Sequence, residues 1–208
     1  MKMIKKTIKK IVLNILPLSL FLKTFKNCSN SIVLTFDDGP HPEITPLIIN
    51  ALDEKKVKGV FFFQGNLMEK YPEIVLMAYK SGHQITNHSY SHARKLNFSN
   101  FKQEISKTEK IIENICGRSF HLFRPPYGIV SLPLLLYCFS NGLKIVHWSF
   151  DSKDSLSAKR TEIADNVRST VKGGDILLFH NDEKECASVI GEVVQICLDK
   201  GYHPVLFS

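Results

Sequence analysis

From residue 30 onward, the sequence alternates short runs of β-type residues with longer segments of helical periodicity. No long polar linker or sequence repeat interrupts this alternation. Strict alternation of strand and helix patterns predicts parallel strands in a single α/β domain. The predicted strands are residues 32–36, 60–63, 84–87, 121–123, 144–149, 176–179 and 203–207. The predicted helices are residues 44–56, 72–81, 99–116, 132–140, 159–171 and 187–200.

Seven predicted strands suit a distorted, incomplete (β/α)7 barrel, in which helices surround a curled parallel sheet. An open doubly wound sheet has the same strand and helix pattern and remains an alternative. The alternation assigns residues 31–208 to the α/β domain and leaves residues 1–30 as a separate N-terminal segment. A chain of 208 residues with 44% hydrophobic side chains is long enough to fold around one core without disulfides.

The net charge of +7 comes entirely from the N-terminus of the chain. Residues 1–26 contain seven lysines and no acidic residue, whereas residues 27–208 contain 20 basic and 20 acidic residues. The lysines are Lys2, Lys5, Lys6, Lys9, Lys10, Lys23 and Lys26. The body of the chain therefore lacks the excess of basic residues that is typical of nucleic-acid-binding domains. A basic tail followed by apolar residues favours contact with a membrane surface instead.

The apolar run Ile11–Leu22 follows most of these lysines and is twelve residues long, with Asn14 and Pro17 inside it. A transmembrane helix needs about 20 apolar residues, so this run is short for a bilayer span. Its length matches the apolar region of a signal peptide, although no A-x-A-like cleavage site follows it. Three interpretations remain open: a membrane-associating segment, a signal peptide with a poor cleavage site, or an amphipathic helix packed on the domain. We expect the protein to be membrane-associated or exported.

Polar residues that can act as metal ligands, acids, bases or charge partners follow five of the predicted strands. Because the carboxyl ends of parallel strands meet at one face of the sheet, these residues are expected to converge there. Isolated surface residues would not be expected to fall at so many strand ends. The residues are Asp37, Asp38, His88, His92, Arg124, Asp151, Asp154 and His180.

His88 and His92 are four residues apart and can reach a single metal ion from one side of a turn or helix. A carboxylate from Asp37 or Asp38 would complete a set of two histidines and one carboxylate with an open position for water. This ligand set suits catalytic zinc, and it also holds iron or cobalt. A pair of surface histidines is the alternative, and it is the better explanation of an isolated H-x-x-x-H pattern. The neighbouring aspartates favour the metal site.

Asp37 and Asp38 are adjacent carboxylates that follow an apolar strand. Two such charges repel each other in a partly buried site, so a metal ion or an arginine is needed to offset them. An ordinary Asp-Gly turn explains Asp38 but does not explain Asp37. Arg124 precedes two prolines that stiffen its loop, which favours a fixed position over a solvated surface arginine. For His180, a buried and hydrogen-bonded core histidine is an equally good explanation.

Five motifs of this chain resemble those of the polysaccharide deacetylase (NodB-homology) family, in the same order along residues 31–208. The first three, TFDDGP (35–40), HSYSH (88–92) and RPPYG (124–128), are specific. The last two, HWSFDSKD (147–154) and LLFH (177–180), are individually loose. The resemblance implies an incomplete barrel and a metal-dependent hydrolase that removes N-acetyl groups from an amino-sugar polymer, such as peptidoglycan or a chitin-like oligomer.

The resemblance also implies a role for each matching residue. Asp38, His88 and His92 would hold a divalent metal ion, with zinc expected first and cobalt or another divalent ion as alternatives. Asp37 would be the general base that deprotonates the attacking water, whose pKa the ion lowers. The backbone N–H of Tyr127 would stabilise the oxyanion together with the ion.

The remaining roles concern orientation, proton donation and substrate packing. Arg124 would pair with Asp37 and hold its orientation. His180 would protonate the leaving amine, with Asp154 as its partner. Two apolar side chains would line the pocket for the acetyl methyl group and the sugar, namely Trp148 and Leu178.

The fourth motif departs from the family at one position. The family commonly has an aromatic residue, usually Trp, where this chain has Ser155. This change puts the choice of Asp154 over Asp151 in doubt and predicts altered substrate packing.

Two other functions remain open at this stage. The first is an O-acetyl esterase or a small-amide hydrolase of the same fold. The second is a non-catalytic carbohydrate-binding protein of the cell envelope. Retention of Asp37 and His180 argues against the second, because binding requires neither a base nor an acid.

Overall fold

The computed structural model describes residues 21–24, 29–94, 100–156 and 158–208. Its parallel sheet has the strand order β1-β6-β5-β4-β3-β2-β8-β7, with β9 paired to the start of β2. The strands are β1 (Phe21–Leu22), β2 (Ser31–Asp38), β3 (Val60–Phe63), β4 (Gln84–Asn87), β5 (Leu122–Phe123), β6 (Lys144–Val146), β7 (Phe150–Asp151), β8 (Ile176–His180) and β9 (His203–Pro204). The helices are α2 (Ile44–Glu54), α3 (Gly65–Lys70), α4 (Pro72–Lys80), α5 (Phe101–Cys116), α6 (Leu132–Ser140), α7 (Arg160–Thr170) and α8 (Lys184–Asp199), with short 3₁₀ turns η2 (Pro126–Gly128) and η3 (Asp154–Leu156).

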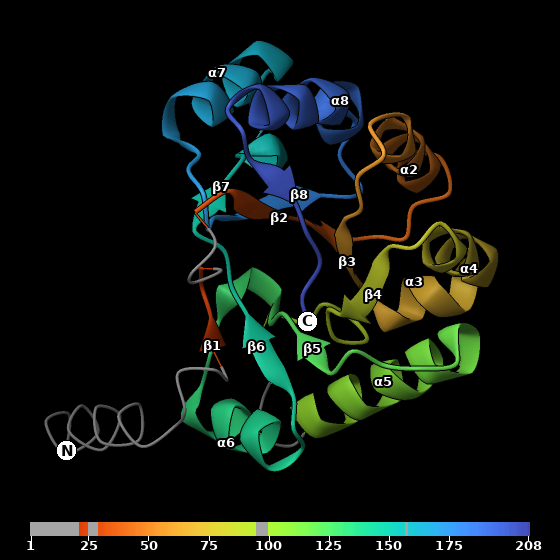
Figure 1. Ribbon diagram of the computed structural model, residues 1–208. Helices are drawn as coiled ribbons and strands as arrows, with labels where there is room; N and C mark the ends of the chain where they lie inside the picture. The colour runs from red at the N-terminus through yellow and green to blue at the C-terminus, as the bar shows by residue number, and fades with distance from the viewer. Residues whose placement is uncertain (1–20, 25–28, 95–99, 157) are drawn as a thin grey trace, which may run out of the picture.

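The sheet is curled into an incomplete barrel with its helices on the outside, as Figure 1 shows. The curl follows from the chain connection between β6 and β7. These strands lie near opposite edges of the sheet, yet only residues 147–149 separate them. A fully extended connection of that length spans at most about 14 Å, so the two edges must approach each other. The prediction of an incomplete barrel is confirmed, and the open sheet is excluded.

Side chains of the strands alternate between the interior of the barrel and the layer beneath the helices, as a β-strand requires. In β2, the side chains of Ile32, Leu34 and Phe36 belong to the large core cluster under the helices. Val33 belongs to the interior cluster. By this two-residue period, Thr35 and Asp37 also face the interior. The polar site therefore lies on the inner face, at the end of the strands.

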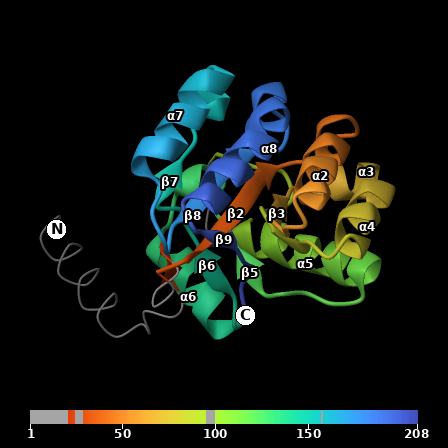
Figure 2. The same cartoon turned by 45° about the horizontal axis from the view of Figure 1, so that its top comes forward.

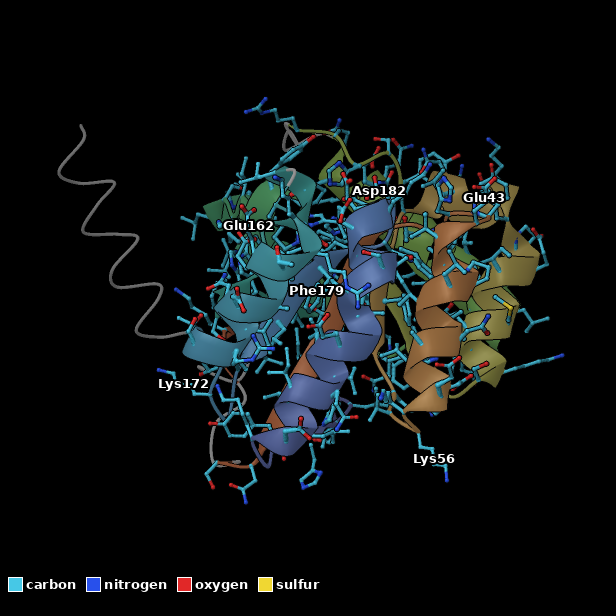
Figure 3. All side chains as sticks on the ribbon, turned by 90° about the horizontal axis from the view of Figure 1, so that it is seen from above. Glu43, Lys56, Glu162, Lys172, Phe179 and Asp182 are labelled. Atoms are coloured by element: carbon cyan, nitrogen blue, oxygen red, sulfur yellow. The ribbon has the colours of Figure 1, made fainter. Side chains whose placement is uncertain are left out.

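The helices begin at the end of the molecule where the strands finish. Figure 3 shows Glu43 before α2 and Asp182 before α8 at this end, and Lys56 and Lys172 toward the opposite end. The turned view in Figure 2 shows α2, α7 and α8 side by side over β2 and β8. Each strand therefore delivers its last residues to a single face of the barrel.

The C-terminal segment covers the other end of the barrel. The side chain of Gln84 donates a hydrogen bond to the carbonyl of Phe207 (2.6 Å) and accepts one from its N–H (3.0 Å). Phe207 packs in the interior cluster with Val33 and Phe62. Substrate access is therefore expected from the opposite end, where the polar residues lie.

Most predicted elements are present, but several differ from prediction, and the predicted strand 203–207 is shortened to β9 (His203–Pro204). The predicted strand 144–149 ends early, at Val146 of β6, and β7 follows only at Phe150. The strand breaks because the N–H of His147 bonds to Leu22, whereas the N–H of Ser149 bonds to Ile176 across the barrel opening. Helix α3 and strand β1 were not predicted, and α8 begins at Lys184 instead of residue 187. Strand β1 pairs with β6, so two residues of the predicted N-terminal segment lie in the sheet.

Residues 1–20 lie outside the described part of the chain, so the interpretations of the apolar run stay predictions. Within the described ranges, no helix has the length and apolar character needed to cross a bilayer.

Candidate active site

Asp37 and Asp38 end strand β2 and lie on different sides of the site. Asp37 is nearly buried, with 4% of its surface exposed. Asp38 has a φ angle of 70°, in the left-handed region that side chains other than glycine rarely adopt. This conformation directs the backbone away from the strand at the point where Gln64, directly after β3, donates a 2.9 Å hydrogen bond to Asp38 Oδ1. The two adjacent carboxylates therefore have different hydrogen-bond donors, Arg124 for Asp37 and Gln64 for Asp38.

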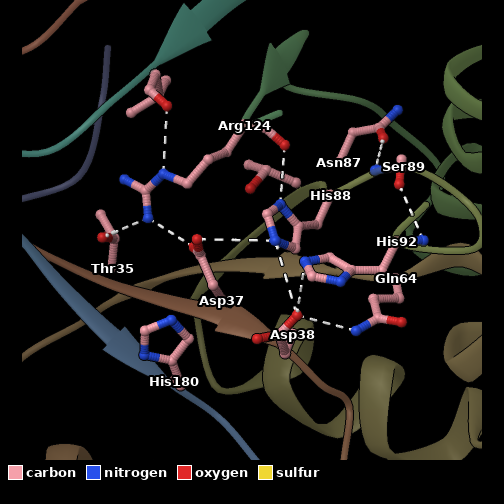
Figure 4. A network of polar contacts seen from close by, with 12 residues as sticks. Thr35, Asp37, Asp38, Gln64, Asn87, His88, Ser89, His92, Arg124 and His180 are labelled. Atoms are coloured by element: carbon pink, nitrogen blue, oxygen red, sulfur yellow. Dashed lines mark hydrogen bonds and ion pairs between the residues drawn. The ribbon is translucent and has the colours of Figure 1, made fainter. Parts of the chain in front are cut away.

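Asp38, His88 and His92 form a compact group of possible metal ligands. One ligand atom from each residue lies within 4.8 Å of the others. The Nε2 atoms of His88 and His92 are 3.7 and 3.2 Å from Asp38 Oδ1, and Figure 4 shows both rings turned toward this carboxylate. Two imidazole nitrogens and one carboxylate oxygen are the donor types that catalytic zinc sites use.

The hydrogen bonds of His88 leave its metal-facing nitrogen available as a ligand. Its Nδ1 lies 2.8 Å from the carbonyl oxygen of Arg124, which can only accept a hydrogen bond. The proton of neutral His88 is therefore on Nδ1, and Nε2 presents a lone pair toward Asp38. Burial and the neighbouring His88 lower the pKa of His92, which favours its neutral, metal-binding form. These residues fit a divalent metal ion.

Helix α5 holds the loop that carries both histidines. Oε2 of Glu104 accepts hydrogen bonds from the backbone N–H groups of Tyr90 (3.0 Å) and Ser91 (2.7 Å). Asn87 donates to Glu109 of the same helix and accepts from the N–H of Ser89. His92 has a φ angle of 54°, so this loop keeps an unfavourable backbone conformation that the surrounding hydrogen bonds stabilise.

Arg124 is completely buried beneath the site and contacts Asp37 directly. Its Nη1 donates to Asp37 Oδ1 (2.6 Å) and to Thr35 Oγ1 (2.8 Å). Its other nitrogens donate to the carbonyls of Val146 (3.2 Å) and His147 (3.1 Å). The guanidinium thus offsets the charge of Asp37 and fixes one carboxylate oxygen, while Oδ2 faces Nε2 of His88 at 3.8 Å.

His180 ends strand β8 and pairs with Asp154. The register places His180 beside Asp37, and its Nδ1 is 2.7 Å from Asp154 Oδ1. Burial alone would lower the pKa of His180, but the hydrogen bond and charge of Asp154, with smaller contributions from Asp37 and Asp38, raise it to about 9. Asp151 instead pairs with Lys153 (2.8 Å), so the structure brings Asp154, and not Asp151, to His180.

Tyr127 lies at the mouth of the site, in the turn after Arg124. Its φ angle is 57°, its side chain is exposed, and its ring centroid is 4.8 Å from that of His92. The next residue, Gly128, has its carbonyl 3.0 Å from Nε2 of His147. A Cβ atom on Gly128 would fall 2.8 Å from the His147 ring, so only glycine permits this close approach.

Trp148 and Leu178 are the two apolar residues predicted for the site. Trp148 is partly buried, stacks on His147 with ring centroids 4.6 Å apart, and packs with the interior cluster. Leu178 is 3% exposed and lies two residues before His180 on the same face of β8. Their contact with a substrate stays a prediction.

Sequence reasoning missed several polar residues that support the site. Gln64 follows strand β3 directly, so its position could have identified it, but its amide does not titrate and gives no chemical signal of a role. Thr35 points inward by the two-residue period of β2. Glu104 and Glu109 lie on a helix with no local signal that marks them.

Comparisons with known proteins identify the family to which this chain is similar. The family model of polysaccharide deacetylase matches residues 26–146. A peptidoglycan-N-acetylglucosamine deacetylase of Bacillus cereus is 37% identical over 152 residues, which are 72% of this chain and 55% of that protein. A chitooligosaccharide deacetylase of Azorhizobium caulinodans is 35% identical over 155 residues, 73% of this chain and 74% of that protein. This chain thus spans only about half the length of the first relative.

Comparison with solved structures also finds similarity to a deacetylase. The crystal structure of a peptidoglycan N-acetylglucosamine deacetylase bound to N-hydroxy-4-(naphthalen-1-yl)benzamide superimposes with a TM-score of 0.86. It is 30% identical in sequence and covers 90% of both chains.

Proposed function

Because the chain belongs to the polysaccharide deacetylase family, we propose that it hydrolyses N-acetyl groups of an amino-sugar polymer, such as peptidoglycan or a chitin-like oligomer. The reaction consumes one water, breaks the bond between the carbonyl carbon and the nitrogen, and yields acetate and a free amine. The observation that carries the proposal is the position of Asp37. Its carboxylate is fixed by Arg124 on one side and lies beside both the Asp38–His88–His92 group and His180.

Asp38, His88 and His92 are the residues that would hold a divalent metal ion, with zinc expected first. When bound, such an ion lowers the pKa of water and polarises a carbonyl oxygen. The lone pair on Nε2 of His88, fixed by the carbonyl of Arg124, supports this assignment. The hydrogen bond from Gln64 orients the carboxylate of Asp38 toward the two histidines.

Asp37 is proposed as the general base. Arg124 binds its Oδ1, which leaves Oδ2 to accept a proton from water as the water attacks the acetyl carbon. The backbone N–H of Tyr127 is proposed to donate a hydrogen bond to the oxyanion that develops on the carbonyl oxygen. Arg124 does not touch the substrate in this scheme and acts as a positioning residue.

His180 is proposed as the general acid. Its hydrogen bond to Asp154 and its raised pKa keep it protonated at neutral pH, as donation to a leaving amine requires. The nitrogen takes this proton as its bond to the acetyl carbon breaks. Asp154 stabilises the imidazolium form and fixes the ring orientation. Trp148 and Leu178 are proposed to contact the acetyl methyl group and the sugar.

An O-acetyl ester is the second candidate substrate, because the same base and oxyanion donor would serve ester hydrolysis. An alkoxide leaving group depends less on protonation than an amine, so the His180–Asp154 pair favours the amide. A non-catalytic carbohydrate-binding protein would need neither Asp37 nor the charged pair.

The test is acetate release from an N-acetylglucosamine oligomer by the purified protein. The assay is run before and after chelation, and again after zinc or cobalt is added back, with Asp37→Asn as the base-deficient variant. Release that chelation abolishes, metal restores and the variant lacks would support the proposal. No release from N-acetylated substrates, with release from O-acetylated ones, would favour the esterase. No release from either substrate by a metal-loaded protein would favour the non-catalytic alternative.

A further inference from the structure

His147 directly follows strand β6, which lies beside β1 in Figure 1. The side chain is partly buried and stacks on two aromatic rings, with centroid distances of 4.6 Å to Trp148 and 5.3 Å to Phe21. The backbone N–H of His147 donates a 2.7 Å hydrogen bond to the carbonyl of Leu22 in β1. These contacts fix the position of an imidazole ring to which the proposed reaction gives no role.

The imidazole ring of His147 binds the turn that carries Tyr127. Its Nε2 lies 3.0 Å from the carbonyl oxygen of Gly128. Because a carbonyl oxygen can only accept a hydrogen bond, Nε2 carries the proton. Burial lowers the pKa of His147, which favours a neutral ring with this single proton. The contact is therefore a hydrogen bond donated by Nε2–H to the turn.

The turn η2 has a backbone conformation that needs support from its surroundings. Tyr127 has φ 57° and ψ 13°, and Gly128 follows with a φ angle of 65°, so two consecutive residues lie in the left-handed region. The N–H groups of Gly128 and Ile129 donate to the carbonyls of Pro125 (3.0 Å) and Pro126 (3.2 Å). These two bonds do not use the N–H of Tyr127, which is the proposed oxyanion donor. The direction of that N–H is set by the conformation of the turn.

The backbone of His147 also contacts the arginine that holds the proposed base. The carbonyl of His147 accepts a 3.1 Å hydrogen bond from Nη2 of Arg124, whose Nη1 donates to Asp37. One residue therefore contacts both the turn of the oxyanion donor and the guanidinium that orients the base. A substitution of the side chain removes only the first contact, because every residue retains the backbone carbonyl.

We propose that His147 is a positioning residue, whose Nε2–H holds the turn so that the N–H of Tyr127 points at the carbonyl oxygen of the substrate. The inference rests on the proposed deacetylase function and adds a residue to it. His147 does not touch the substrate. The aligned N–H gives most of its stabilisation when negative charge develops on the oxygen, so loss of the alignment lowers kcat and leaves KM nearly unchanged.

The test compares three substitutions of His147 in the zinc-loaded full chain. His147→Gln retains an N–H donor near the position of Nε2, His147→Asn carries the same amide on a shorter side chain, and His147→Phe retains a ring without a donor. Acetate release from an N-acetylglucosamine oligomer gives kcat and KM, a chelating dye gives zinc affinity, and urea denaturation gives the free energy of unfolding. We expect kcat to fall by about 10- to 100-fold in His147→Asn and His147→Phe, the range expected for a misplaced oxyanion donor. KM and zinc affinity should stay close to wild type, and His147→Gln should recover most of kcat.

Each alternative outcome has a distinct meaning. Unchanged kcat in His147→Asn and His147→Phe, beside an active wild type, would overturn the role of His147 and leave the proposed function intact. A loss of kcat that His147→Gln does not recover, or that parallels a loss of zinc affinity or stability, would show that His147 only supports the fold. No acetate release by the wild type would overturn the proposed function and this role with it. If His147→Phe does not fold, the comparison of His147→Gln with His147→Asn decides.

Discussion

Nδ1 of His180 lies 2.7 Å from Oδ1 of Asp154, whose side chain has no exposed surface. The second carboxylate oxygen accepts the backbone N–H of His180 at 2.8 Å, so the same aspartate fixes both the ring and the main chain. The Asp154 charge raises the pKa of His180 against the opposing effect of burial. The protonation state of the proposed general acid therefore depends most strongly on one neighbouring carboxylate, with smaller contributions from Asp37 and Asp38.

Asp154→Asn is expected to change the pH dependence of acetate release. Removal of the negative charge lowers the pKa of His180, so the protonated acid is lost at lower pH than in the wild type. In the profile of kcat against pH, the decrease on the alkaline side should therefore begin closer to neutral pH. Asp151→Asn is the matched control, because Asp151 pairs with Lys153 instead. An unchanged alkaline decrease in Asp154→Asn, measured with an N-acetylglucosamine oligomer, would show that His180 does not act as the acid.

Asp37→Asn is expected to separate metal binding from activity. The variant lacks the proposed base but retains Asp38, His88 and His92, so zinc affinity measured by competition with a chelating dye should stay within a few-fold of wild type. Acetate release should fall by about 10²- to 10⁴-fold, the usual contribution of a general base. His88→Ala should lose both properties, whereas His121→Ala, at an exposed histidine away from the site, should lose neither.

Arg124→Met is expected to destabilise the folded protein. The change leaves the buried carboxylate of Asp37 without its cation, a loss that costs about 3–5 kcal/mol in comparable buried pairs. The double variant Asp37→Asn/Arg124→Met removes the unpaired charge and should recover a large part of that free energy of unfolding. Urea denaturation of the wild type and the two variants measures both effects. If the double variant is no more stable than the single arginine variant, charge pairing is not the cause of the loss.

Gln64→Leu is expected to weaken metal binding without removing a ligand. The amide of Gln64 donates to Oδ1 of Asp38, the oxygen that faces both histidines. Loss of such an orienting hydrogen bond typically reduces metal affinity by about 10- to 100-fold. Gln195→Leu, on the exposed side of α8, is the control substitution. Metal affinity equal to wild type in Gln64→Leu would mean that the carboxylate is held by other contacts.

Protonation of the buried His83 is expected to lower the free energy of unfolding at acid pH. Its Nδ1 accepts a hydrogen bond from the N–H of Gly59, and burial lowers its pKa from 6.5 to about 4. In the unfolded chain the imidazole of His83 takes up a proton near pH 6.5, whereas in the folded protein it does so only near pH 4. Stability is therefore lost as pH falls through this window, by up to about 3 kcal/mol at 1.36 kcal/mol per pH unit. In His83→Gln, the free energy of unfolding should change less between pH 7 and 4.

Most residues of the candidate site could be predicted from the sequence, because parallel strands all end at one face of the sheet. This rule identified Asp37, Asp38, His88, Arg124 and His180 from β-type runs alone. It could not distinguish Asp154 from Asp151, since the choice depends on how the chain turns after β7. The His180–Asp154 contact at 2.7 Å makes that distinction.

Other features depend on tertiary contacts that leave no local pattern. Residues 144–149 are compatible with one continuous strand, and only their partners on opposite edges of the sheet divide them. Strand β1 has two residues and lies within an apolar run, so periodicity cannot mark it. The amide of Gln64 neither titrates nor carries a charge, so its position after β3 is the only sign of its role.

The strand order also determines when the site can form during synthesis on the ribosome. Strand β2 lies between β3 and β8, and β8 is made after residue 175, so one edge of β2 stays unpaired until most of the chain has emerged. Asp38, His88 and His92 all precede residue 93, whereas Asp154 and His180 arrive much later. The proposed metal ligands are thus all synthesised before the proposed proton donor, and the proposed hydrolysis would begin only when the last third of the polypeptide has folded against the first.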